Sequence, residues 1–259
     1  MQDLKVVLVQ ADQRWEQKSA NHAHFSELLS TLNEQVDLII LPEMFDTGFS
    51  MNTDLAEDWN GNTSKSFVQQ LAKQYNSAVY TSMMCKESGR YYNRGVFVLP
   101  DGNTHQYDKR KCFGLAGEDK VFTAGNAESI AELKGWNIQL QICYDLRFPE
   151  ICRNRIVDSG EPAYDLLLYV ANWPEKRSEH WKILLQARAI ENQCYVLGVN
   201  RIGEDGKGLM YTGDSCAVDP LGKVELCPPS QETLKVVTLS KSALWEIRQS
   251  LPFLKDRKC

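Results

Sequence analysis

The chain has 259 residues, of which 43% are hydrophobic and 24% charged, and its formal net charge is −5 at pH 7. The hydrophobic fraction is typical of an ordinary globular core and argues against intrinsic disorder. The acidic balance lacks the basic footprint of a nucleic-acid-binding protein, and no stretch approaches the roughly 18 consecutive apolar residues of a membrane span.

The start of the chain and its cysteines favour a reducing compartment. Residues 1–10 enter an apolar, strand-like run without the charged leader, apolar core and cleavage site of a secretory signal. The cysteines form no C-x-x-C pair and lack zinc-ligand spacing. They are Cys85, Cys112, Cys143, Cys152, Cys194, Cys216, Cys227 and Cys259. We expect reduced thiols in a cytoplasmic protein whose site needs neither a metal nor an organic cofactor, because Gly-rich phosphate loops are lacking too.

Strand-like and helix-like segments alternate through the first half of the chain, which is typical of an α/β layered domain. In chain order we expect a strand at 4–10, a helix near 17–34, a strand at 36–42, a helix near 64–75, and strands near 77–84 and 92–99. In the helix near 64–75, the apolar residues recur at the spacing of one helix face.

The first candidate functional residue, Glu43, stands just beyond the apolar run 38–41. A continuous apolar run is typical of a strand buried on both faces. A carboxylate where such a strand ends needs a partner, since an isolated buried charge is costly. Taken alone, the segment is more typical of a capped strand end.

A basic cluster at 106–113 contains the second candidate, Lys109. It follows a turn at 100–103, whose Asp-Gly pair is a strong turn signal. Taken alone, the cluster is typical of a solvated charged loop.

The third candidate, Cys143, directly ends an apolar strand at 138–142, and a turn and a proline-led helix are expected after it. The strand would fix the approach of the thiol, and the turn would aim the next backbone N–H groups at the group under attack. A buried core cysteine is the competing interpretation, because free cysteine is among the most buried residue types. Together, Glu43, Lys109 and Cys143 on strand-end loops could cleave a carbon–nitrogen bond.

The second half of the chain faintly echoes the first. We expect a strand at 164–170, a helix at 178–193, a strand at 194–200, a segment 211–222 that matches 91–102, and a short helix at 240–248. Because no low-complexity stretch or Pro/Gly-rich linker divides the chain, we expect one domain over residues 1–259.

Three segments together resemble the nitrilase superfamily of carbon–nitrogen hydrolases. They are Pro42-Glu43, Tyr107-Asp108-Lys109 and the octapeptide 143–150. The resemblance covers essentially the whole chain and is closest to the bacterial omega-amidases, because the segments 170–174 and 187–193 are also similar to that branch. It implies a four-layer α-β-β-α sandwich with two pseudo-symmetric halves, and a homodimer. One departure is Lys111-Cys112, where the family commonly has His-Leu near the pocket wall.

The resemblance also implies a role for each candidate residue. Cys143 would attack the amide carbon and form a thioester, while Glu43 would move the protons. Lys109 and the backbone N–H of Tyr144 would stabilise the oxyanion. Glu118 aligns with a second family glutamate that supports the lysine, although a surface loop acid is the alternative.

The remaining candidates would contact the substrate. Arg147 could bind a substrate carboxylate, or it could pair with Glu150 as part of the structure. Asn172 and Trp173 follow the strand that echoes the one before Glu43, so they should face the same cleft, with the tryptophan as an apolar wall.

The implied function is hydrolysis of the terminal amide of a short dicarboxylate monoamide, of the 2-oxoglutaramate or 2-oxosuccinamate type, to the acid and ammonia. The alternative within the superfamily is another amide, nitrile or carbamoyl hydrolase. A catalytically idle binding protein is the alternative from another class, and the presence of all three reactive residues argues against it.

Overall fold

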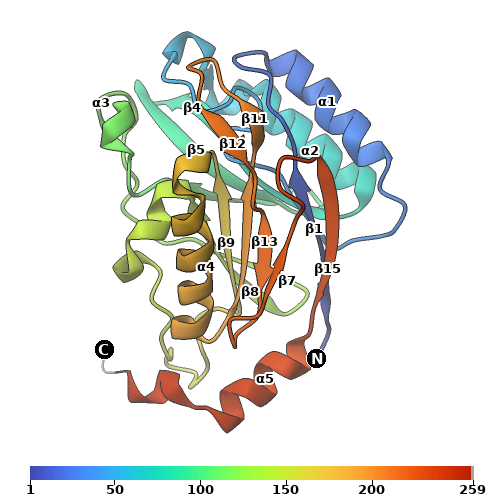
Figure 1. Ribbon diagram of the computed structural model, residues 1–259, viewed down its shortest axis with the longest axis vertical. Helices are drawn as coiled ribbons and strands as arrows, with labels where there is room; N and C mark the ends of the chain where they lie inside the picture. The colour runs from blue at the N-terminus through green and yellow to red at the C-terminus, as the bar shows by residue number, and fades with distance from the viewer. Residues whose placement is uncertain (258–259) are drawn as a thin grey trace.

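The computed structural model describes residues 1–257, in which two β-sheets pack face to face and helices cover their outer faces (Figure 1). Cys259 lies outside the described residues, and the other seven cysteines are free thiols.

The first sheet is built mainly from the N-terminal half. Its order is β15-β1-β2-β4-β5-β6, and a short strand β3 pairs with β4. The strands are β1 (Leu4–Gln10), β2 (Leu38–Ile40), β3 (Glu57–Asp58), β4 (Ala78–Glu87), β5 (Arg90–Val98), β6 (Thr104–Asp108) and β15 (Thr233–Leu239). Strands β1, β2 and β4 run parallel, whereas β5, β6 and β15 pair antiparallel with their neighbours.

The second sheet repeats this arrangement. Its order is β14-β13-β10-β9-β8-β7. The strands are β7 (Ile130–Leu133), β8 (Trp136–Ile142), β9 (Leu166–Ala171), β10 (Tyr195–Asn200), β13 (Cys216–Val218) and β14 (Val224–Leu226). Strands β8, β9 and β10 are parallel and the others antiparallel, so β8 and β9 correspond to β1 and β2. The faint echo in the sequence therefore reflects two pseudo-symmetric halves.

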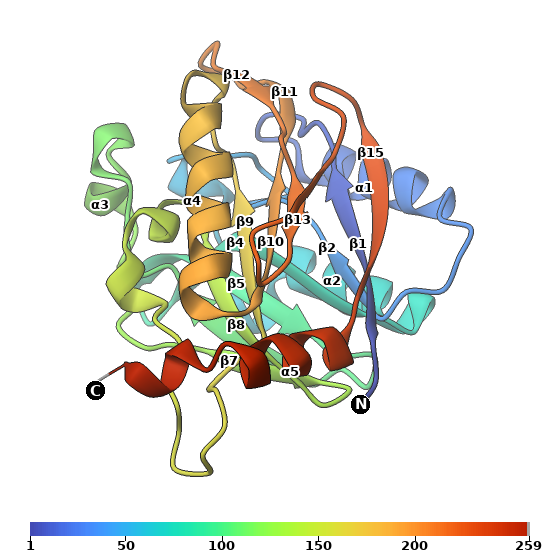
Figure 2. The ribbon, with the colours of Figure 1, turned by 60° about the horizontal axis from the view of Figure 1, so that its bottom comes forward.

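Helices complete a four-layer α-β-β-α sandwich. They are α1 (Lys18–Ser30), α2 (Thr63–Tyr75), α3 (Glu118–Val121), α4 (Ser178–Asn192) and α5 (Lys241–Ser250). Helices α1 and α2 cover the first sheet, α4 covers the second, and α5 runs across one end near the N-terminus (Figure 2). Strands β11 (Ile202–Glu204) and β12 (Met210–Thr212) form a separate hairpin. Within residues 1–257, no helix is both long and apolar enough to cross a membrane.

Short 3-10 helices make up several of the connections. They are Thr53–Leu55, Trp59–Gly61, Gly114–Ala116, Cys143–Arg147, Pro149–Ile151, Glu175–Arg177 and Phe253–Asp256.

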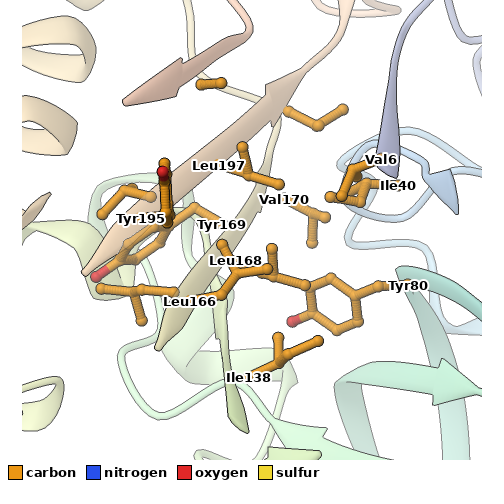
Figure 3. Packing of buried hydrophobic residues seen from close by; sticks show 14 of the residues in the cluster. Val6, Ile40, Tyr80, Ile138, Leu166, Leu168, Tyr169, Val170, Tyr195 and Leu197 are labelled. Atoms are coloured by element: carbon orange, nitrogen blue, oxygen red, sulfur yellow. The ribbon is translucent and has the colours of Figure 1, made fainter. Parts of the chain in front are cut away.

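The largest apolar cluster lies between the two sheets. Val6, Ile40 and Tyr80 of the first sheet lie toward Ile138 and Val170 of the second (Figure 3). A buried apolar interface of this extent fixes the separation of the sheets, because protein interiors are closely packed.

A second cluster lies between the first sheet and its helices. Ile39 belongs to it together with Phe25 of α1 and Val68 of α2, whereas its neighbours Leu38 and Ile40 belong to the cluster between the sheets. Alternate side chains of a strand point to opposite faces. The run 38–41 is therefore continuously apolar because β2 is buried on both faces.

Two expected helices differ in the structure. The helix near 17–34 ends at Ser30, because both the backbone N–H and the hydroxyl of Thr31 donate to the carbonyl of Leu28 and close the last turn. The proline-led helix after the cysteine is only the 3-10 turn Pro149–Ile151.

Candidate active site

The three main candidates meet at one end of the sandwich. Glu43 follows β2, Lys109 follows β6 and Cys143 follows β8. The Nζ of Lys109 lies 2.9 Å from Oε1 of Glu43, and both charges act on the thiol of Cys143. The structure therefore brings together three residues that span 100 positions of the sequence, from Glu43 to Cys143.

Lys109 is a buried cation between two carboxylates. Its Nζ lies 2.9 Å from Glu43 and 2.9 Å from each carboxylate oxygen of Glu118, and only 1% of its side chain is exposed. Burial lowers its pKa, but Glu118 and Glu43 raise it more, so the pKa lies well above its ordinary value. The lysine is therefore a permanent positive charge at neutral pH. Glu118 is fully buried, so its alternative interpretation as a surface loop acid is wrong.

Glu43 is held on both carboxylate oxygens. Oε1 accepts from Lys109 and, at 2.8 Å, from the side-chain amide of Asn93, while Oε2 accepts from the backbone N–H of Asn172 at 2.8 Å. Its carbonyl oxygen accepts from the side chains of Asn172 and Gln13. These contacts leave the carboxylate little rotational freedom.

Asn93 and Gln13, which both donate hydrogen bonds to Glu43, were not predicted from the sequence. Asn93 carried a weak signal, because asparagine is depleted in strands and this one stands within an otherwise strand-like segment. Gln13 carried none.

Cys143 has a left-handed backbone conformation, with φ of +46°. Such a conformation costs about 1–3 kcal/mol in a residue other than glycine, so the surroundings must impose it. The carboxylate of Asp145 contributes to this constraint, because it accepts from the backbone N–H of Ile142 at 3.0 Å.

Asp145 also reaches the segment that carries Lys109. It accepts from the hydroxyl of Tyr107 at 2.9 Å and from the backbone N–H of Lys111 at 2.9 Å. Burial raises the pKa of Asp145 to about 6, although the charge of Lys109 and these hydrogen bonds lower it. This residue, which the sequence analysis missed, joins the turn of Cys143 to the loop of Lys109.

The thiol of Cys143 is protonated at neutral pH. Burial raises its pKa well above the ordinary value, the charge of Glu43 raises it further, and Lys109 lowers it. Only a thiolate is strongly nucleophilic, so the thiol needs a base. The neighbouring carboxylate of Glu43 can act as that base.

The thiol opens into a small cavity of about 70 Å³. Aromatic side chains and cations form most of its wall, which consists of Phe49, Phe113, Ala116, Tyr144, Arg147, Asn172, Trp173, Pro174, Arg177, Asp205, Lys207, Leu209 and Tyr211. Asn172 and Trp173 therefore line the same cavity as Cys143, as expected, and Tyr144 and Arg147 line it too. Neither Lys111 nor Cys112 lines the cavity, so the departure from the family pattern lies outside it.

A larger hollow of about 310 Å³ lies between α5 and the loop around residue 160. No cysteine lines this hollow, whereas Cys143 lines the smaller cavity, so we assign the chemistry to the smaller cavity. Within residues 1–257, no group of three or more His, Cys, Asp or Glu side chains is arranged to hold a metal ion.

Arg147 lies against an aromatic wall instead of an acid. Its guanidinium carbon is 4.8 Å from the ring centroid of Trp173, and it donates to Nδ1 of His180 at 3.1 Å. Glu150 lies 3.6 Å from the Nζ of Lys111. The alternative in which Arg147 pairs with Glu150 is therefore wrong.

Comparison with known proteins gives consistent matches. The carbon–nitrogen hydrolase family matches residues 5–249. The omega-amidase YafV of Escherichia coli (strain K12) is 42% identical over 99% of this chain and 97% of its own length. The 2-oxoglutaramate amidase of Bacillus subtilis (strain 168) is 30% identical over 86% of each.

Solved structures agree. XC1258 from Xanthomonas campestris, a CN-hydrolase superfamily protein with an arsenic adduct in its active site, superposes with a TM-score of 0.97 at 41% identity, covering 100% of this chain and 98% of that one. Nit3 of Saccharomyces cerevisiae superposes with a TM-score of 0.83 at 22% identity over 100% and 97% of the two chains, a likeness of fold alone.

Proposed function

The chain belongs to the carbon–nitrogen hydrolase family, and from this premise we propose that it is an omega-amidase. Its substrate is a short dicarboxylate monoamide, of the 2-oxoglutaramate or 2-oxosuccinamate type, and its products are the acid and ammonia. The observation that carries the proposal is the contact between Lys109 and Glu43 beside the thiol of Cys143, which lines a small cavity that also contains three cations.

In the first half-reaction Cys143 attacks the amide carbon while Glu43 takes its proton. A carbon–sulfur bond forms, and the carbonyl oxygen gains negative charge beside Lys109 and the backbone N–H of Tyr144. The tetrahedral intermediate then loses its carbon–nitrogen bond. Glu43 delivers its proton to the leaving nitrogen, so ammonia departs and a thioester remains.

In the second half-reaction water hydrolyses the thioester. Glu43 takes a proton from water as the oxygen attacks the thioester carbon. The carbon–sulfur bond breaks, the acid is released, and the proton returns to the sulfur of Cys143. The same carboxylate serves both half-reactions, and Asn93, Asn172 and Lys109 hold it in place throughout.

Recognition of the substrate's carboxylate falls to Arg147. Its guanidinium is stacked on Trp173, which leaves N–H groups at its edge to meet a carboxylate. The ring of Trp173 supplies the apolar wall for the methylene groups of the substrate.

An ammonia-release assay on a matched panel tests the proposal. The panel contains dicarboxylate monoamides, neutral amides of equal chain length, nitriles and N-carbamoyl compounds. We expect the monoamides to be turned over fastest, without release of carbon dioxide, which separates an amidase from a carbamoylase. Equal or faster turnover of the neutral amides or nitriles would contradict it.

Two expectations stay predictions: a homodimer and a cytoplasmic location. Light scattering coupled to size-exclusion chromatography measures the first, and cell fractionation measures the second.

A further inference from the structure

The cavity contains a second arginine, Arg177, for which the mechanism above has no use. It ends the 3-10 turn Glu175–Arg177, directly before α4. Its guanidinium carbon lies 5.4 Å from the ring centroid of Phe113, and both residues line the cavity over Cys143.

Neither arginine of this cavity has an acidic partner among residues 1–257. The ion pairs of that part of the chain include neither Arg147 nor Arg177, whereas the buried Arg94, Arg188 and Arg201 each pair with Asp or Glu. A guanidinium matches a carboxylate through two parallel N–H···O bonds. Both cavity arginines therefore keep N–H groups for a ligand, although Nη2 of Arg147 also donates to Nδ1 of His180.

The two guanidinium groups are held by different rings of one small cavity. Arg147 lies over Trp173, and Arg177 lies over Phe113. The indole N–H of Trp173 also donates to the carbonyl oxygen of Arg177 at 2.8 Å, which ties the backbone of one arginine to the ring that supports the other. Stacking restrains each guanidinium plane without occupying its N–H groups.

The charge of the wall favours an anion. Three cations line the cavity, Arg147, Arg177 and Lys207, against a single acid among the described lining residues, Asp205. The oxygens of Asp205 already accept from the hydroxyl of Tyr211 and from two backbone N–H groups of its own hairpin. The whole chain has a net charge of −5, so the positively charged wall of this cavity should attract anionic ligands to the cavity.

We propose that Arg177 is a specificity-determining residue that binds the substrate's carboxylate together with Arg147. The ligand class is an amide whose opposite end carries a carboxylate, held between two guanidinium groups while the amide lies at Cys143. The inference rests on the proposed function and adds a second arginine to it.

The test compares Arg177→Gln with a matched control, Lys176→Gln. Lys176 is the preceding residue of the same 3-10 turn, is exposed, and does not line the cavity. Two substrates are used, glutaramate and its neutral analogue pentanamide, together with glutarate as an inhibitor that binds without turnover.

We expect Arg177→Gln to lower the ratio of kcat/KM for glutaramate to that for pentanamide by about 10–100-fold, the range for loss of a charge-assisted hydrogen bond. The effect should lie mainly in KM, and the inhibition constant of glutarate should rise by a similar factor. Arg177→Lys should recover part of the loss, because it restores the charge without the planar fork. Lys176→Gln should change neither quantity.

The outcomes separate the two proposals. If the wild type prefers glutaramate and Arg177→Gln leaves both the ratio and glutarate binding unchanged, the inference is overturned while the omega-amidase stands. Equal losses on both substrates with unchanged glutarate binding would show a structural role and overturn it as well. If the wild type does not prefer glutaramate to pentanamide, both the proposed function and this inference are contradicted.

Discussion

Asn172 holds Glu43 at two points, since its backbone N–H donates to the carboxylate at 2.8 Å and its side-chain amide donates to the carbonyl oxygen of Glu43 at 2.6 Å. The two residues follow β2 and β9, which occupy equivalent places in the two sheets. Corresponding positions of the two halves therefore meet face to face at the site. This contact fixes the candidate base relative to the sheet that carries the candidate nucleophile.

Replacement of the nucleophile should abolish turnover and spare the fold. Cys143→Ala removes the thiol but leaves a small side chain in the same left-handed backbone position. We expect no detectable ammonia release and a melting temperature within a few degrees of the wild type. Mass spectrometry should find an acyl adduct on Cys143 of the active enzyme. An adduct on Cys112 or Cys152 instead would overturn the assignment.

Glu43→Gln keeps the size of the side chain and removes proton transfer. We expect kcat to fall by about 10²–10⁴-fold, the usual contribution of a general acid–base. Steady-state kinetics at saturating substrate measures the loss. A reduction below about tenfold would show that another group moves the protons.

Lys109→Met keeps most of the aliphatic stem and removes the charge. The loss of oxyanion stabilisation should raise the barrier by about 3–4 kcal/mol. It also leaves Glu43 and Glu118 buried without their shared cation, and breaking a buried ion pair destabilises a protein by about 3–5 kcal/mol. Urea unfolding of the variant measures this second effect.

The double variant tests whether the two residues act as one unit. Because Lys109 contacts Glu43 directly, removal of either disables the same step. The double variant should lose far less activity than the product of the single losses. Fully multiplicative losses, with each single variant still folded, would show independent action.

The raised pKa of Asp145 should make the free energy of unfolding depend on pH. Its pKa is about 6 in the folded protein and about 4 in an unfolded chain. Between these values the folded state holds a proton that the unfolded chain has released, so the free energy of unfolding falls as the pH rises. The contribution is on the order of 2–3 kcal/mol.

Urea unfolding of the wild type and of Asp145→Asn between about pH 4 and 7 isolates this contribution. The difference in stability between the two proteins should shift in favour of Asp145→Asn as the pH rises through this window. A difference that is independent of pH would show that Asp145 does not take up the proton.

A substitution at Gly125 tests whether activity depends on the position of the loop that carries Lys109. Its backbone N–H donates to the carbonyl of Lys109, and a Cβ at this position would lie 2.2 Å from the carbonyl oxygen of Asp108. Gly125→Ala should displace the loop and lower kcat at least tenfold. The matched control is Gly61→Ala, whose Cβ would meet nothing within 4 Å. Equal activity of the two variants would show that the loop tolerates the shift.

The sequence allowed prediction of the parts that depend on local pattern. Glu43 and Cys143 were found because each stands where a buried apolar strand ends, and Lys109 and Glu118 because the family resemblance singled them out. Strand β2 was visible as the continuous apolar run 38–41, which is typical of a strand buried on both faces. The pairing of β15 with β1 was not foreseen, since residues separated by more than 220 positions meet there.

The supporting hydrogen bonds could not be predicted for the same reason. Gln13 reaches Glu43 across 30 positions, and Asn172 reaches it across 129. The first contact depends on the pairing of β1 with β2, and the second depends on how the two sheets are packed against one another. No local pattern encodes either arrangement. The proline-led helix after the cysteine was wrong because only a single 3-10 turn, Pro149–Ile151, forms there.

The candidate site is divided between the two sheets, so the apolar layer that joins them also sets the relative position of the site residues. The candidate base Glu43 and Lys109 follow strands of the first sheet, and the candidate nucleophile Cys143 follows a strand of the second. The hydroxyl of Tyr80 in the first sheet donates to the carbonyl of Gln141 in the second, two residues before Cys143. A slight slip of one sheet over the other would separate proton acceptor from thiol while leaving each half well folded. The arrangement of the three residues therefore depends on rigid packing between the sheets, and neither sheet alone carries all three.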